Sequence, residues 1–213
     1  MLSRLAVGLT LLFLLLMLVI HAQRYDSSSV RALLLPPAGC VAPCFQGLRP
    51  GHSTIIDALA FFQQRPELNV YVERSNAAHD NTLMNWRDSR RGYRGALHFV
   101  DGLLTELTVS GLNLDQVWLA LGEPDGAQMA NEIIYIGEQQ SILRPTANIG
   151  FYIANQFRLN FASACADFWD QTVYITMGQT VVPDKLTDAV TLGEQRQIVC
   201  EKERALRRAG LGE

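Results

Sequence analysis

An uninterrupted apolar segment near the N-terminus is the strongest constraint on this chain. Residues 5–20 carry no charged side chain, and Arg4 and Arg24 flank them. A helix over residues 5–22 would be about 27 Å long, close to the hydrocarbon thickness of a bilayer. We therefore expect residues 1–22 to be an uncleaved signal-anchor, or a signal peptide that is removed after Ala22. A buried helix of a soluble domain is the third alternative.

Arg4 and the amino terminus compete with Arg24 and Arg31 in setting the orientation of an anchor, and we expect the N-terminus inside and the bulk of the chain outside the cytoplasm. The protein would be anchored to a membrane through residues 5–22, or secreted if the segment is cleaved. In such an oxidising compartment an even number of cysteines predicts disulfides. The chain has four cysteines: Cys40, Cys44, Cys165 and Cys200. Proximity in sequence favours Cys40–Cys44 and Cys165–Cys200 among the three pairings that four cysteines allow.

Residues 23–47 have the composition of a linker. They include three consecutive serines at 27–29 and the pair Pro36-Pro37, without a sustained apolar period. Such segments typically hold a folded domain away from a bilayer. We expect a linker that carries Cys40 and Cys44.

A helix followed by short strands is predicted for a first unit, residues 48–110. Ser53 or Thr54 is suited to cap the helix, and Asp57, three residues after Thr54, approximates a capping box with it. The expected apolar face of this helix consists of Ile55, Leu59 and Phe62. Four extended runs follow, and Asp101-Gly102 between the last two predicts a tight hairpin turn. These runs are residues 70–74, 83–88, 96–99 and 103–109.

The same pattern begins again at Gly111, 60 residues after Gly51, and defines a second unit, residues 111–178. Asn113 is a suitable helix cap, with Gln116 three residues later. The expected buried face consists of Leu114, Val117 and Leu121. Gly122 suits the positive φ at a helix C-terminus, and Pro124 prevents the helix from resuming. Strands are expected at residues 129–136, 149–154, 156–162 and 173–177.

These segments predict an α+β fold. An N-terminal transmembrane or signal helix would precede two helix-plus-antiparallel-meander repeats, each with its helix covering one face of a small sheet. The tail, residues 179–213, contains alternating charges with spaced apolar residues between 192 and 208. We expect a surface helix there, held in place through Cys200.

The second unit resembles the opening of the SmpA/OmlA outer-membrane assembly lipoproteins. That family begins with a glycine, a polar helix cap, Gln-Val and then Leu-Gly-x-Pro. Here Gly111, Asn113, Gln116-Val117 and residues 121–124 match in order and spacing. The wider fold group includes the β-lactamase-inhibitor-protein type, a tandem of such units. The resemblance implies a non-enzymatic module that contacts other proteins. The chain differs from the lipoproteins in its doubled unit and in lacking a suitable lipidated cysteine.

No catalytic, cofactor-binding or metal-binding constellation stands out from the sequence. Cys40 and Cys44 have three residues between them, whereas thiol oxidoreductases use two at a helix N-terminus. A structural disulfide is therefore favoured over redox or metal chemistry. His79-Asp80 could approach His98 on a sheet face, but isolated histidines are more common. The net charge of −3 argues against nucleic acid as a partner.

Arginines and aromatic residues are concentrated between two predicted strands. The group consists of Trp86, Arg87, Arg90, Arg91, Tyr93 and Arg94. Because arginine pairs with carboxylates and stacks on aromatic rings, we consider these residues candidates for binding an anionic or acidic partner. The alternative is a solvated hairpin loop. Trp86 and Trp118 also occupy apolar positions of their elements, so both are expected in the core.

The favoured function is an extracytoplasmic, membrane-tethered protein-interaction module of the cell envelope, without enzymatic activity, whose partner is another envelope protein. A small exported enzyme that uses Cys40 and Cys44 for thiol-redox or metal chemistry is the first alternative. A structural scaffold without a dedicated ligand is the second. The state of the two cysteines separates the enzyme from the module, since an enzyme needs a reactive thiol.

Overall fold

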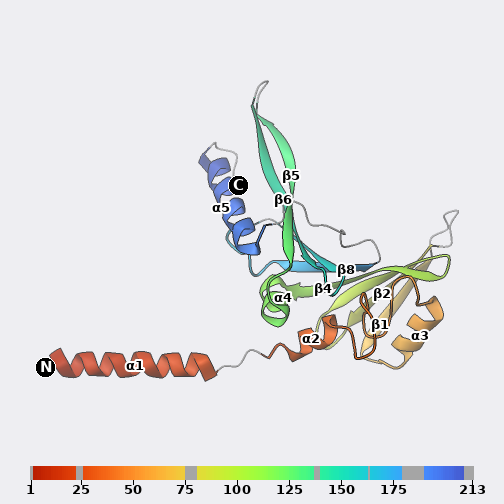
Figure 1. The fold of residues 1–213 in the computed structure, drawn as a ribbon, viewed down its shortest axis with the longest axis horizontal. Coiled ribbons are helices and arrows are strands. Elements are labelled where there is room, and N and C mark those ends of the chain that lie inside the picture. The colour runs from red at the N-terminus through yellow and green to blue at the C-terminus, as the bar shows by residue number, and fades with distance from the viewer. Residues whose placement is uncertain are drawn as a thin grey trace.

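The computed structural model describes residues 2–22, 26–74, 81–136, 140–162, 164–178 and 190–208. Within these ranges the chain folds into five helices and a single antiparallel sheet of eight strands (Figure 1). The strand order is β1-β2-β3-β4-β8-β7-β6-β5. The sheet therefore consists of two four-stranded meanders, β1–β4 and β5–β8, whose last strands, β4 and β8, pair at the centre. The expected α+β class is confirmed.

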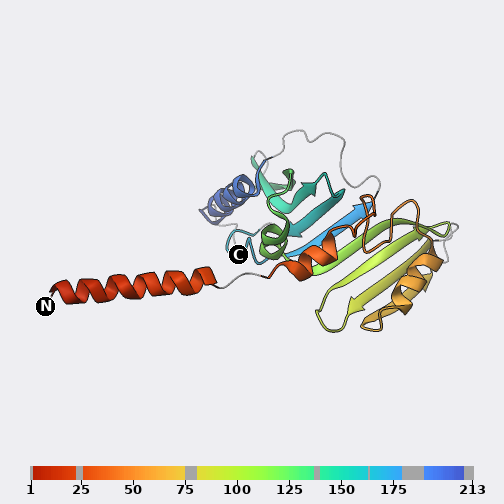
Figure 2. The ribbon, with the colours of Figure 1, turned by 60° about the horizontal axis from the view of Figure 1, so that its bottom comes forward.

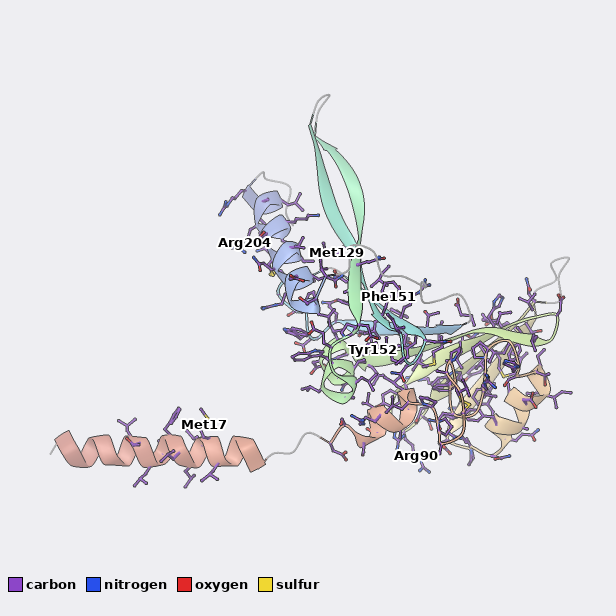
Figure 3. All side chains as sticks on the ribbon, in the orientation of Figure 1. Met17, Arg90, Met129, Phe151, Tyr152 and Arg204 are labelled. Atoms are coloured by element: carbon purple, nitrogen blue, oxygen red, sulfur yellow. A yellow bond between two sulfur atoms is a disulfide. The ribbon has the colours of Figure 1, made fainter. Side chains whose placement is uncertain are left out.

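The N-terminal helix α1, Leu2–Ala22, extends away from the sheet (Figure 1). Apolar side chains are more than 40% exposed at nine of the ten positions from 9 to 18, and they point to all sides of the helix, Met17 among them (Figure 3). Among the described residues, no helix combines the length and hydropathy expected of a membrane-crossing segment. The expected transmembrane helix is therefore not confirmed.

The first half of the fold begins with helix α3, Ile55–Gln63, and of the two predicted caps, Ser53 and Thr54, the helix uses Thr54 with Asp57 as its partner. The backbone N–H of Thr54 donates to Asp57 at 2.8 Å, and the N–H of Asp57 donates to Thr54 Oγ1 at 3.3 Å. The strands are β1 Leu68–Arg74, β2 Asn81–Asp88, β3 Arg94–Val100 and β4 Leu103–Asn113. Asp101 and Gly102 have φ values of 51° and 78°, so the predicted tight turn between β3 and β4 is confirmed.

The buried face of α3 differs from the expected one. Ala58 and Phe62 are buried and Ile55 is partly buried, whereas Leu59 is 40% exposed. The helix therefore contacts the core through positions i, i+3 and i+7, with the small side chain of Ala58 at the centre of the contact. Figure 2 shows α3 next to β1 and β2 at the outer end of the sheet.

The second half begins with helix α4, Leu114–Leu121, at the predicted bounds. The N–H of Asn113 donates to Gln116 Oε1 at 3.1 Å, Leu114 and Val117 are buried, and Gly122 has a φ of 86°. The strands are β5 Gly126–Ile136, β6 Gln140–Tyr152, β7 Phe157–Ala162 and β8 Thr172–Gly178. Strand β6 begins nine residues before the predicted run at 149, and pairs with β5 in a long hairpin. Residues 111–113, assigned to the second unit, belong to β4.

The predicted C-terminal helix is confirmed as α5, Leu192–Arg208. It lies beside β5 and β6 (Figure 1), and Gln195 Nε2 donates to the carbonyl oxygen of Gln128 in β5 at 2.6 Å. Its first turn is closed by Thr191, whose N–H donates to Glu194 Oε2 at 2.7 Å. This cap satisfies backbone groups that a helix N-terminus leaves unpaired.

The expected linker, residues 23–47, is in part a folded element. Its described portion contains helix α2, Ser28–Leu34, whose Val30 and Leu34 are buried in the main core. Arg31 Nη1 donates to the carbonyl oxygen of Ala120 at 2.7 Å, which joins α2 to the C-terminal end of α4. Phe45, near the end of the segment, packs on Trp86 with 5.8 Å between ring centroids. The burial of Val30, Leu34 and Phe45 therefore ties this segment to the fold despite its turn-forming serines and prolines.

Candidate functional site

All four cysteines form disulfides, in the predicted pairing. The Sγ atoms of Cys40 and Cys44 are 1.98 Å apart, and those of Cys165 and Cys200 are 2.03 Å apart. No free thiol is present to act as a nucleophile in this state. Among the described residues, no three His, Cys, Asp or Glu side chains gather as metal ligands. His79 and Asp80 lie outside the described residues.

The sheet divides the predicted arginine and aromatic group between its two faces. Side chains alternate along a strand, so Arg87 lies on the face opposite to Trp86. Arg94 is the direct cross-strand neighbour of Arg87. Both arginines are exposed on the face opposite the core. Arg90 and Arg91 lie in the turn between β2 and β3 (Figure 3), and Tyr93 is packed against the core.

Trp86 belongs to the core and does not present its ring to a partner. It is 3% exposed and packs beside Phe45. Gly95 allows this position, because a Cβ atom there would lie 2.8 Å from the Trp86 ring. The expectation that Trp118 is in the core is wrong: Trp118 is 39% exposed and stacks on Trp169 at 5.1 Å. The helix turns its Leu114–Val117 side to the sheet, which leaves Trp118 at the edge.

The face that carries Arg87 and Arg94 has a depression of about 320 Å³ lined only by strand residues. Small side chains form its floor, and tyrosines stand at its two ends. Tyr71 on β1 is 65% exposed and Tyr174 on β8 is 52% exposed. The floor residues are Asn85, Ala96, Thr108 and Ser110. We refer to these eight residues (Tyr71, Asn85, Arg87, Arg94, Ala96, Thr108, Ser110 and Tyr174) as the sheet-face site.

The strand register explains how these residues come together. Tyr71, Asn85, Ala96 and Thr108 are cross-strand neighbours in one row, and Arg87, Arg94, Ser110 and Tyr174 form the next. The hydroxyl of Thr108 accepts from the N–H of Ala96 at 3.2 Å, and the hydroxyl of Ser110 donates to the carbonyl of Arg94 at 3.4 Å. The two floor hydroxyls are thus held by the neighbouring strand.

The electrostatics of the sheet-face site are unusual. Arg87 and Arg94 lie directly opposite each other, and in the described part of the chain neither guanidinium has a hydrogen-bond or ion-pair partner. Two acidic residues of the same face, Glu73 and Glu106, lie towards the opposite end of the strands. The face therefore carries positive charge at one end and negative charge at the other.

A second depression lies on the core side, between α3 and the sheet. It has a volume of about 510 Å³ and is lined by Ile55, Leu59, Val72, Thr82 and Met84. Its lining is largely apolar and it borders β1, an edge strand of the sheet. A smaller depression of about 110 Å³ adjoins Arg91, Tyr93 and Trp86. The first has no charged residue in its lining, and the second is lined by charges of both signs, whereas the charged residues that line the sheet-face site are two arginines.

Sequence reasoning found Arg87 and Arg94 but missed Tyr71, Tyr174 and the small floor residues. Tyr71 alternates with Val70 and Val72, so its orientation away from the core could have been read from the strand period. Nothing local to Tyr174 indicates that it lies beside Ser110, because the pairing of β4 with β8 joins residues 64 positions apart.

The chain matches no protein-family model, no curated protein and no solved structure at a significant level. The resemblance of residues 111–124 to the SmpA/OmlA lipoproteins is therefore untested by these comparisons and stays a prediction.

Proposed function

We propose that this protein is a non-enzymatic interaction module of the cell envelope that binds another envelope protein through the sheet-face site. The observation that supports this most is an open depression with exposed tyrosines and unpaired arginines on a folded sheet. Tyrosine and arginine are enriched at protein interfaces, where tyrosine adds apolar contact area and arginine adds directed hydrogen bonds. Rigid strands would hold these side chains in place before the partner arrives.

The extracytoplasmic location is part of the proposal. Two disulfides suit an oxidising compartment, since cytosolic thiols are kept reduced. We propose that residues 5–22 attach the protein to a membrane, with the sheet outside the cytoplasm. Leucines exposed on all sides of α1 support a lipid environment, because an interfacial helix would have one polar side.

We further propose that the two halves are copies of one unit. Each has a capped helix followed by a four-stranded antiparallel meander, and β4 and β8 occupy equivalent last positions. In this proposal residues 111–124 correspond to the SmpA/OmlA opening, and the doubled unit creates the wide central sheet. The thiol-enzyme alternative is disfavoured by the oxidised state of Cys40 and Cys44.

Site-specific photo-crosslinking in cells tests the proposed function. A photoreactive residue replaces Tyr174 in the sheet-face site of the full chain, and in a control replaces Arg196, an exposed residue of α5. We expect a discrete crosslinked protein at Tyr174, absent at Arg196, in a fraction that stays with membranes through a carbonate wash. An equal pattern at both positions, or no product at Tyr174, would exclude this face as the binding surface. Recovery of a soluble chain that starts at Gln23 would exclude the tether.

A further inference from the structure

We infer that the occupant of the sheet-face site is an extended segment of the partner that carries carboxylate side chains, held by Arg87 and Arg94. This inference rests on the proposed function and specifies the chemistry of the partner. The charge of the site and the shape of the depression both favour an acidic polypeptide.

The positive charge of the site comes from the cross-strand pair Arg87 and Arg94. Residues directly opposite on antiparallel strands have Cβ atoms roughly 5 Å apart, and like charges there repel each other. Arg87 and Arg94 form such a pair, with no acidic partner within the described residues. A carboxylate between them would relieve the repulsion by accepting charge-assisted hydrogen bonds from both guanidinium groups. The pair is therefore better suited to the bound state than to the free one.

The depression has the length of a short extended segment. Tyr71 lies on β1 and Tyr174 on β8, four strand spacings apart, which corresponds to about 19 Å at 4.8 Å per strand. An extended segment of about six residues covers that distance. Between the tyrosines, the Ala96, Thr108 and Ser110 side chains are small enough to leave room for a backbone. The Thr108 hydroxyl, which accepts from Ala96, can donate to a carbonyl of the segment, and the Ser110 hydroxyl, which donates to Arg94, can accept from an N–H of the segment.

The same face disfavours the other anionic partners. Glu73 lies opposite Leu83, which is four positions from Arg87 along β2, and Glu106 is four positions from Ser110 along β4. Four positions correspond to about 13 Å at 3.3 Å per residue. A phosphate-rich surface such as an anionic bilayer or a nucleic acid would meet these carboxylates as well as the arginines. A short segment with its acidic residue at the arginine end avoids them.

The test measures binding of a defined peptide to the full-length protein in detergent. The probe is a fluorescent hexapeptide of alternating serine and glutamate, and its control has glutamine in place of glutamate. We expect the glutamate peptide to bind, with an affinity that falls as salt is raised, and the glutamine peptide to bind at least tenfold more weakly. In NMR spectra, the Nε–Hε signals of Arg87 and Arg94 should shift on addition of the probe.

Matched variants locate the binding. Arg94→Gln and Arg94→Glu should weaken binding of the glutamate peptide at least tenfold, whereas Arg94→Lys should retain most of it. Arg90→Gln, in the turn outside the depression, should change binding less than twofold. Thermal unfolding of each variant verifies that it is folded. Equal binding of both peptides, or equal loss with Arg90→Gln and Arg94→Gln, would overturn the inference.

Two further outcomes separate this inference from the proposed function. Binding of phosphatidylglycerol vesicles that depends on Arg94, without peptide binding, would replace the acidic segment by a lipid surface and overturn the inference. A Tyr174 crosslink in cells that survives Arg94→Glu would leave the interaction module intact and refute only the acidic chemistry of its partner. Absence of that crosslink in the unmodified chain would refute the proposed function itself.

Discussion

At the scale of single residues, the Arg87–Arg94 pair has a cost for folding that the proposed function would explain. Two guanidinium groups on neighbouring strands repel each other, so a fold selected only for stability would place an acidic residue at one of these positions. Functional sites commonly retain such an unfavourable interaction, and favourable interactions elsewhere in the fold offset its cost in free energy. The conflict can be measured directly.

We expect Arg94→Glu to raise the free energy of unfolding by about 0.2–1 kcal/mol, because it replaces a like-charge cross-strand pair with an ion pair. The measurement is urea unfolding at low salt, and the gain should shrink at high salt. Arg90→Glu, in the turn, serves as the control and should change stability little. Destabilisation by Arg94→Glu would show that the guanidinium has a structural partner.

The helix caps make stability depend on pH. Hydrogen bonds from Thr54 lower the pKa of Asp57, and those from Thr191 lower the pKa of Glu194. A carboxyl group whose pKa is lower in the folded state stabilises the fold above its unfolded pKa, near 4, and the contribution is lost as pH falls through the folded pKa. Stability should therefore decrease from about pH 5 downwards.

Asp57→Asn and Glu194→Gln should each reduce the slope of stability against pH in this acidic range and leave it unchanged above about pH 6. Thermal unfolding at a series of pH values measures the slope. Asp101→Asn, in the β3–β4 turn, is a matched carboxylate control outside the caps. A slope identical to that of the unmodified protein would mean that neither carboxylate caps its helix in solution.

At the scale of elements, the packing of α4 can be tested because this helix has one buried and one exposed leucine. Leu114 is fully buried and Leu119 is 52% exposed. We expect Leu114→Ala to cost about 2–5 kcal/mol through lost burial and the cavity left behind. Leu119→Ala should cost less than about 0.5 kcal/mol, as surface substitutions generally do. Chemical denaturation of both variants measures the difference, and similar losses would mean that α4 packs through another face.

The elements that sequence predicted best are those specified by local chemistry. The cap at Asn113 and the positive φ at Gly122 bound α4, and the Asp101-Gly102 turn fixes the β3–β4 hairpin. Helix α2 was missed because Val30 and Leu34 are too few to show a period, and only tertiary contacts reveal their burial. The first half of β6 was missed because its pairing with β5, and not its own composition, extends it.

At the scale of the whole molecule, the sheet order decides where a site can form. The pairing of β4 with β8 joins the two meanders and places Tyr174 beside Ser110. Short-range sequence patterns carry no information about this pairing. The sequence could therefore predict the two arginines of the site but not the tyrosines at its ends. The same order leaves β1 and β5 at the edges of the sheet. At the β5 edge, the backbone of Val190 forms a bridge with Ala127.

The disulfides contribute to stability at this same scale, and unequally. Cys165 precedes β8, a central strand, and Cys200 lies in α5, so their bond fixes the C-terminal helix to the middle of the fold. Their separation is 35 residues, against four for Cys40 and Cys44. Since a bond that closes a longer loop removes more entropy from the unfolded chain, the second bridge should contribute more.

We expect the double variant Cys165→Ala/Cys200→Ala to lose about 4 kcal/mol of unfolding free energy, and Cys40→Ala/Cys44→Ala about 2 kcal/mol, by the loop-entropy relation. Guanidinium unfolding of both variants under oxidising conditions measures the ranking. Thiol labelling of the unreduced, denatured parent should find no free cysteine. A larger loss from the short loop would mean that native packing around Cys44, which is buried beside Phe45, outweighs chain entropy. The anchoring of α5 through Cys200 would then add little to the stability of the sheet.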